Sequence, residues 1–105
     1  MNSLMEIIEK NNIPQKYQEN IQEAYNLLKN EGCKNVYLFG SMITGRIYDH
    51  SDIDIGIKGL PPERFFRVYS KLLFNFDIEF DLVDFDFSRD FFTLLESLDE
   101  VVEIG

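Results

Sequence analysis

The sequence predicts a small α+β domain in which helices pack on a mixed β-sheet. Three observations support this prediction: a long stretch with apolar residues at helical spacing, two short β-favouring runs directly after it, and an alternation of helix and strand patterns in the rest of the chain. At 105 residues the chain suits a single hydrophobic core, so we expect one domain over residues 1–105. Apolar residues make up 45% of the chain and aromatic residues 14%, which is more than a disordered chain carries.

The first part of the chain is predicted to form two helices and a strand. Residues 1–12 mix polar and apolar positions in a way that suits a short helix. A longer helix is expected over residues 14–31, because Pro14 suits a first helical turn and Gly32 suits a left-handed stop. Residues 35–40 are apolar, favour β structure and end on glycine, so they predict a buried strand.

The second part is predicted to add two strands and two helices. Residues 52–57 alternate strictly between isoleucine and other residues, which is typical of a strand with one buried face. A helix is expected to begin at Pro62 and to cover the sheet. A third strand is predicted at about residues 78–85, and a helix should follow from an N-cap at Ser88 through Leu98. The last residues, Val101-Val102-Glu103-Ile104, form a candidate edge strand.

The composition excludes several kinds of function. The formal net charge of -9 and the pI near 4.4 argue against broad binding to a nucleic-acid backbone and favour cations or basic partners. Cys33 is the only cysteine, so no internal disulfide and no multi-cysteine zinc site are expected, and the cytoplasm is the simplest compartment. No basic segment precedes a signal-type apolar run, and no stretch approaches the roughly 18 apolar residues of a membrane span.

Two aspartates on the second predicted strand are candidate metal ligands. Asp52 and Asp54 lie two residues apart, so their carboxylates share one face of the strand at a backbone separation of roughly 6.6 Å. Hard divalent ions such as Mg²⁺ take carboxylate, water and phosphate oxygens, and this chemistry serves phosphoryl transfer. The alternative is an ordinary solvated strand face. A calcium loop is excluded, because Gly56 falls at the fifth position from Asp52, where that loop needs glycine at the sixth.

The corner after the first strand is a candidate phosphate-binding site. Gly40 lets the backbone approach an anionic ligand closely, and the amides and hydroxyl that follow from Ser41 can donate to phosphate oxygens, above all if a short helix begins at residue 42. The alternative is a plain turn between two strands.

Taken together, these residues resemble a known family. The Gly40-Ser41 pair, ten intervening residues and the Asp52-Ile53-Asp54 run are similar to the signature of the polymerase-β-like nucleotidyltransferase superfamily. Within that superfamily, the Ser51–Ile55 segment and the small size resemble the minimal nucleotidyltransferases. The resemblance extends over residues 36–85 and implies the polymerase-β-like nucleotidyltransferase fold.

The resemblance also implies roles for individual residues. Gly40 and Ser41 would hold the triphosphate of a nucleotide such as ATP, and Asp52 and Asp54 would bind Mg²⁺, with Mn²⁺ as a possible substitute. A third carboxylate is expected from the next strand, where the pattern of an acid before apolar residues indicates Asp81. Its implied role is to bind the catalytic metal and to accept the proton of the attacking hydroxyl.

Two details of this set leave alternatives open. Glu79 shares a face with Asp81 by alternation and competes with it for the third position, whereas Asp84 lies on the opposite face. Family members often carry a basic residue where this chain has Thr44; Arg46 could reach the phosphates instead, or it could be a solvated surface residue.

Minimal nucleotidyltransferases resembling this chain are commonly paired with a helical HEPN-type protein in toxin–antitoxin modules. The resemblance therefore implies an antitoxin that transfers AMP from ATP to a tyrosine of its toxin. Two alternatives remain: an antitoxin that acts by binding alone, and one subunit of a two-component transferase that modifies a small hydroxylated molecule. The sequence does not indicate the oligomeric state, and a homo-oligomer is compatible with it. Four aromatic residues are expected in the core, with partner anchoring as the alternative: Phe65, Phe66, Phe91 and Phe92.

Overall fold

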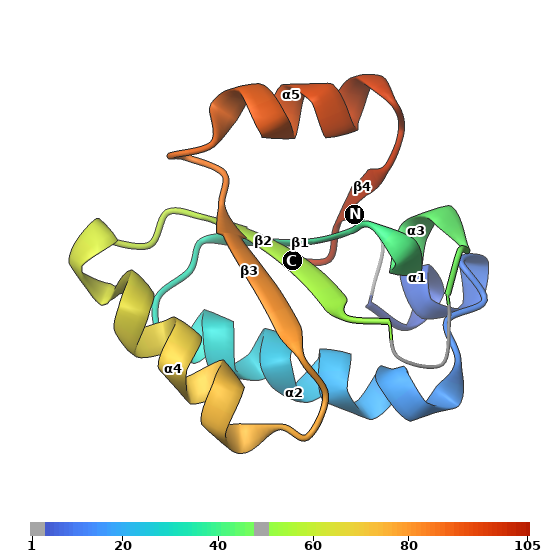
Figure 1. The fold of residues 1–105 in the computed structure, drawn as a ribbon, viewed down its shortest axis with the longest axis horizontal. Coiled ribbons are helices and arrows are strands. Elements are labelled where there is room, and N and C mark those ends of the chain that lie inside the picture. Colours follow the sequence, from blue (N-terminus) through green and yellow to red (C-terminus); the bar gives the residue numbers. More distant parts are fainter. Residues whose placement is uncertain (1–3, 48–50) are drawn as a thin grey trace.

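Four strands form one mixed sheet in the order β3-β2-β1-β4 (Figure 1). The structure is a computed structural model that describes residues 4–47 and 51–105. Strand β1 is antiparallel to both β2 and β4, whereas β3 runs parallel to β2. The mixed sheet predicted from the sequence is therefore confirmed. The strands are β1 (Asn35–Phe39), β2 (Ile53–Lys58), β3 (Phe80–Asp84) and β4 (Val101–Glu103).

The predicted helices are also confirmed, with ends that shift by a few residues, as helix ends commonly do. A short helix, α3, follows Gly40 and begins at Ser41, one residue before the position considered in the sequence analysis. The segment that begins at Pro62 starts with a 3₁₀ turn, η1. Ser88 occupies the predicted N-cap position of α5, but its side chain makes no capping hydrogen bond. The helices are α1 (Leu4–Lys10), α2 (Gln15–Asn30), α3 (Ser41–Thr44), η1 (Pro62–Arg64), α4 (Phe65–Asn75) and α5 (Arg89–Ser97). None of the helices in these ranges is long and apolar enough to cross a bilayer.

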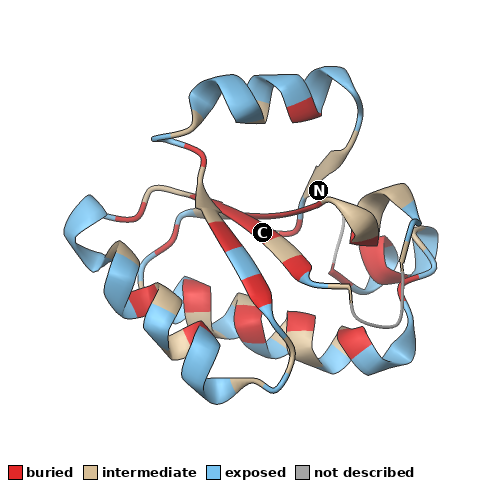
Figure 2. Cartoon of the chain, in the orientation of Figure 1, coloured by how far each residue is buried: buried red, intermediate tan, exposed pale blue. Residues whose placement is uncertain are grey.

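The two faces of the sheet are covered differently. Helices α2 and α4 lie on one face, where Ile53, Ile55 and Ile57 are completely buried in the main core (Figure 1). Helix α5 lies over the other face, above a smaller aromatic cluster that includes Tyr37 and Phe85. Figure 2 shows buried positions along the strands and α2, while α5 is mostly exposed. The main core thus holds one face rigidly, and the other face is only partly covered.

The expectation that four helical phenylalanines are core residues is wrong for two of them. Phe66 is 80% exposed and Phe91 is 38% exposed, whereas Phe65 and Phe92 are partly buried against the two clusters. For Phe66 the reason lies in helix geometry, because the inward positions of α4 are taken by Val68 and Leu72, which are four residues apart.

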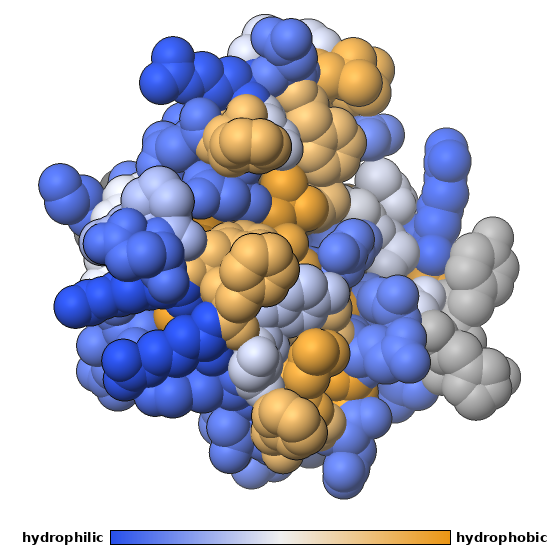
Figure 3. All heavy atoms as spheres, turned by 60° about the vertical axis from the view of Figure 1, so that its left-hand side comes forward, coloured by the Kyte–Doolittle hydropathy of each residue, from blue (hydrophilic) through white to orange (hydrophobic). Residues whose placement is uncertain are grey.

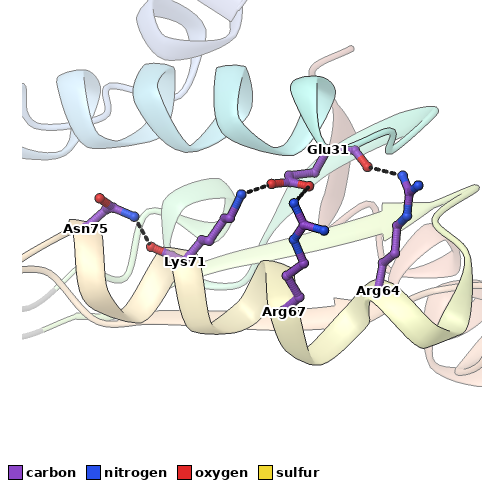
Figure 4. Close-up of polar contacts among 5 residues, drawn as sticks. All are labelled: Glu31, Arg64, Arg67, Lys71 and Asn75. Carbon is purple, nitrogen blue, oxygen red and sulfur yellow. Dashed lines mark hydrogen bonds and ion pairs between the residues drawn. The ribbon is translucent and has the colours of Figure 1, made fainter.

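A cluster of ionic contacts fixes α4 against the end of α2 (Figure 4). Lys71 Nζ donates to the Glu31 carboxylate, and Arg67 Nη2 lies 3.9 Å from its other oxygen. Arg64 Nη1 donates to the Glu31 carbonyl oxygen at 3.4 Å. The hydrogen bond from Lys71 lowers the pKa of Glu31 below its ordinary value. These contacts hold the helix that packs against β3, the strand that carries Asp81.

Candidate functional site

Two of the predicted acidic residues lie at paired positions on neighbouring strands. In the parallel register of β2 and β3, Asp54 is the partner of Asp81. Paired residues point to the same face of a sheet, and neighbouring strands are roughly 4.8 Å apart, so the two carboxylates lie side by side. Asp52 lies two residues before Asp54, directly before β2 begins. The face that carries these acids is the partly covered face beneath α5.

The Asp54 carboxyl group differs from its two acidic neighbours in its burial. It is half-buried, whereas Asp52 and Asp81 are exposed. Burial, and then the negative charges of Asp81 and Asp52, raise the pKa of Asp54 from 3.8 to about 6. Raised carboxyl pKa values caused by burial and neighbouring charge are typical of functional sites. The site therefore crowds negative charge that a proton or a metal cation would relieve.

The apolar surroundings of Asp54 explain its burial. Phe39 is its partner in the antiparallel register with β1. Farther along the same face, the Phe85 ring occupies the space above Gly56, where a Cβ atom would overlap it. Sequence reasoning missed this aromatic wall. The alternation that puts Tyr37 and Phe39 on one face is a signal for it, but only the pairing of β1 with β2 shows that this face also carries Asp54.

The geometry separates the candidates for the third acid. Asp84 is in register with Ile57, on the opposite face from Asp81, as alternation predicts. Glu79 lies just before β3 and lines a hollow of about 350 Å³ together with Asp52. After burial, the charge of Asp81 contributes most to the raised pKa of Asp54, followed by that of Asp52. The structure thus brings Asp81, rather than Glu79, into direct proximity with Asp54.

The Gly40 corner lies against the Asp54 carboxylate. Its backbone has φ 69° and ψ -145°, a conformation that is essentially restricted to glycine. A Cβ atom at this position would also collide with Asp54 Oδ2. Both facts explain why glycine ends the first strand, and they place the backbone of the corner next to the acid pair.

Helix α3 leaves donors free at this corner. The N–H groups of Ile43 and Thr44 donate to the Gly40 carbonyl oxygen at 3.0 and 2.9 Å, and the Gly45 N–H donates to that of Ser41. Within residues 4–47 and 51–105, the Ser41 N–H and hydroxyl have no hydrogen-bond partner. Both groups are suitable donors to phosphate oxygens.

Arg46 is the basic candidate for contact with the phosphates. The Arg46 side chain is exposed, and its backbone N–H donates to Thr44 Oγ1 at 3.4 Å. No ion pair joins Arg46 to an acid among the described residues. Residues 48–50, in the same connection to β2, lie outside the described part of the chain.

The acidic residues fit a hard divalent cation. Their donors are carboxylate oxygens, and the raised pKa of Asp54 marks a surplus of negative charge where a cation would bind. Among residues 4–47 and 51–105, no three acidic, histidine or cysteine side chains already converge on one point as a complete metal-binding group. Mg²⁺ is commonly held by one or two carboxylates together with water and substrate phosphates, so a nucleotide would complete the coordination.

A mixed sheet with an acid pair beside a glycine corner defines a nucleotidyltransferase domain. The family model described as Polymerase beta, Nucleotidyltransferase matches residues 19–100. The chain belongs to this family. No curated protein sequence matches it.

Several solved structures share the fold of this chain. A toxin–antitoxin structure with AMP-PNP has a TM-score of 0.63 and 25% identity, over 80% of this chain and 71% of that chain. The toxin–antitoxin MntA–HepT has a TM-score of 0.59 and 24% identity, over 84% of this chain and 71% of that chain. A tri-AMPylated Shewanella oneidensis HEPN toxin in complex with MNT antitoxin gives the same TM-score of 0.59, identity of 24%, and coverage of 84% and 71%.

Proposed function

We propose that this chain is a Mg²⁺-dependent nucleotidyltransferase that moves AMP from ATP to a hydroxyl group of a partner protein. The partner is a helical HEPN-type toxin, and the chain acts as its antitoxin. One observation carries the proposal: the Asp54–Asp81 pair lies next to a glycine-only corner that leaves the donors of Ser41 free. Carboxylates for a cation and donors for phosphate then meet at one end of the sheet.

The comparisons support the choice of nucleotide and partner. AMP-PNP, an ATP analogue, is present in one toxin–antitoxin structure that resembles the chain, and the toxin in another is AMPylated. The family match supports nucleotidyl transfer in general. Transfer to a protein is a proposal for this chain, and so is the cytoplasm as its compartment, where Cys33 stays reduced.

The proposed reaction is an in-line displacement at the α-phosphorus of ATP. The oxygen of the acceptor hydroxyl forms a new bond to this phosphorus, while the bond to the oxygen that bridges to the β-phosphate breaks. Pyrophosphate leaves with the bonding electron pair, and the hydroxyl proton passes to the Asp81 carboxylate. The Ser41 N–H and hydroxyl orient the triphosphate, with Arg46 as a further contact to its charge.

Asp52, Asp54 and Asp81 would hold the metal. When bound, Mg²⁺ supplies positive charge that stabilises the attacking and leaving oxygens of the displacement. Without it, the half-buried Asp54 and its acidic neighbours repel the triphosphate, so we expect ATP binding to depend on the cation.

Intact-mass measurement of the partner tests the proposal. The chain is incubated with ATP, Mg²⁺ and a purified HEPN-type protein of the same genome, and the partner should gain the mass of one or more AMP units. No gain should occur with Asp54→Asn. If the partner's mass never changes and Asp54→Asn still neutralises it, the chain is an antitoxin that acts by binding alone. If only small hydroxylated molecules gain AMP, the two-component transferase is correct.

The third acid is tested by two matched variants. Asp81→Asn should abolish transfer while affecting ATP affinity less than loss of both Asp52 and Asp54, because Asp81 also acts on the acceptor hydroxyl. Glu79→Gln should retain transfer. An inactive Glu79→Gln beside an active Asp81→Asn would reverse the assignment.

A further inference from the structure

An apolar groove lies along the outer edge of the sheet, beside β3. It has a volume of about 710 Å³ and is bounded by β3, by η1 with the start of α4, and by the turn that leads into α5. Two phenylalanines that line it are almost fully exposed: Phe66 is 80% exposed and Phe87 is 89% exposed. We call this feature the β3 groove. Figure 3 shows apolar side chains gathered across the face that carries it, between blue hydrophilic margins.

Such a surface is unusual for a chain that acts alone. Large apolar side chains exposed next to a hollow commonly mark a site of protein interaction, since water contact with them is unfavourable. Aromatic side chains that enter a partner's surface are also frequent centres of binding energy. The β3 groove therefore has the composition of an interface centre.

Two aspartates, Asp84 and Asp86, give the rim of the groove a negative charge. Asp84 Oδ1 accepts the backbone N–H of Asp86 at 2.9 Å, and Asp86 Oδ2 accepts the backbone N–H of Gly59 at 2.7 Å. Neither carboxylate pairs with a lysine or arginine among the described residues, where both ion pairs involve Glu31. Arg89 Nε donates to the Asp86 carbonyl oxygen at 3.2 Å, not to the carboxylate.

The basic side chains nearby leave the charge of this rim negative. The basic side chains of η1 and α4 turn to Glu31, on the side of α4 that meets α2 (Figure 4). The charge around the groove therefore matches a partner with lysines and arginines around an apolar centre. A second copy of this chain would bring another formal charge of -9 and is disfavoured.

The groove also lies close to the acid pair. Val83, which lines the groove, is two residues beyond Asp81 on the same face of β3, a backbone distance of roughly 6.6 Å. A protein segment seated in the groove thus lies within side-chain reach of the carboxylates.

We propose that the β3 groove is the docking site of the acceptor protein, and that it binds a segment with apolar side chains flanked by lysine or arginine. This inference rests on the proposed function, because it places the acceptor of that reaction. Docking at this edge brings the acceptor hydroxyl to the strand that carries Asp81.

Three serine variants test the proposal. Phe66→Ser and Phe87→Ser each remove an aromatic ring that lines the groove, and Phe74→Ser is the matched control, since Phe74 is 88% exposed on α4 but does not line the groove. Calorimetry measures the binding of each variant to a purified HEPN-type protein of the same genome. The groove variants should bind roughly 30-fold or more weakly, and the control should bind as the wild type does. Higher salt should weaken wild-type binding.

Binding of ATP with Mg²⁺ to the isolated chain separates the possible outcomes. Weak partner binding with unchanged ATP binding in both groove variants supports the docking site. If both groove variants bind the partner as tightly as the wild type does, the docking site is wrong and the proposed function is unaffected. The same conclusion follows if the wild type is a dimer that dissociates when Phe66 or Phe87 is replaced. A wild-type chain that binds the partner through the groove but never transfers AMP overturns the proposed function alone. A wild-type chain that does not bind the partner overturns both.

Discussion

The half-buried Asp54 predicts a variant that is more stable than the wild type. In Asp54→Asn, the amide keeps the shape of the carboxylate and removes its charge from the group formed with Asp52 and Asp81. The difference between a pKa of about 6 and the ordinary 3.8 corresponds to about 3 kcal/mol, at roughly 1.4 kcal/mol per pH unit. Because Asp54 is only half-buried, we expect a gain of about 1 to 3 kcal/mol in the free energy of unfolding near pH 7.

The sign of this effect follows from proton linkage. The folded carboxyl binds its proton more tightly than the unfolded one, so the wild type loses stability as the pH rises from about 4 to about 6. The advantage of Asp54→Asn should therefore be complete at neutral pH and fall by about half near pH 5.

Urea denaturation of the metal-free proteins measures this difference. Asp90→Asn is the control, because it removes one negative charge from an exposed position on α5 and so tests whether the total charge alone is responsible. We expect Asp90→Asn to give no gain. A stability of Asp54→Asn equal to or below that of the wild type at pH 7 would refute the crowding of carboxylates on which the metal site rests.

Three further predictions follow from single contacts. Gly40→Ala should abolish metal-dependent ATP binding, because its Cβ collides with Asp54 Oδ2, whereas Gly45→Ala, which also has positive φ but open space around it, should only lower stability by about 1 kcal/mol in urea denaturation. Cys33, 3% exposed and with a pKa raised by burial to about 11, should resist alkylation at neutral pH until urea unfolds the chain; rapid labelling of the folded protein would contradict this. Glu31→Gln should cost about 1 kcal/mol by weakening the Lys71 contact. Because that contact lowers the pKa of Glu31, the cost should disappear as the pH falls and the carboxyl is protonated; a cost independent of pH would argue against the ion pair.

Local patterns predicted the elements and part of the site. The alternation of isoleucines in residues 52–57 gave the buried face of β2 and, with it, the shared face of Asp52 and Asp54. The glycine at position 40 indicated a backbone corner, and the structure has a positive φ there. These features depend on neighbours in the sequence, so the sequence alone suffices to predict them.

Features that depend on long-range pairing could not be predicted. The proximity of Asp54 and Asp81 requires the parallel register of β2 and β3, strands separated by the whole of α4. The burial of Asp54 requires Phe39 from β1 and Phe85 from beyond β3. The exposure of Phe66 depends on which face of α4 meets the sheet, and composition alone favoured the core.

The most direct test of the proposed metal site is whether ATP binding depends on a divalent ion and on Asp52 and Asp54. Calorimetry with Mg²⁺, with Mn²⁺ and without a divalent ion compares the wild type with the double variant Asp52→Asn, Asp54→Asn, after circular dichroism has established that both are folded. We expect the wild type to bind ATP only with a divalent ion, and the double variant not to bind it under any of these conditions. Metal-dependent binding of equal affinity by the folded double variant would show that these carboxylates do not hold the metal.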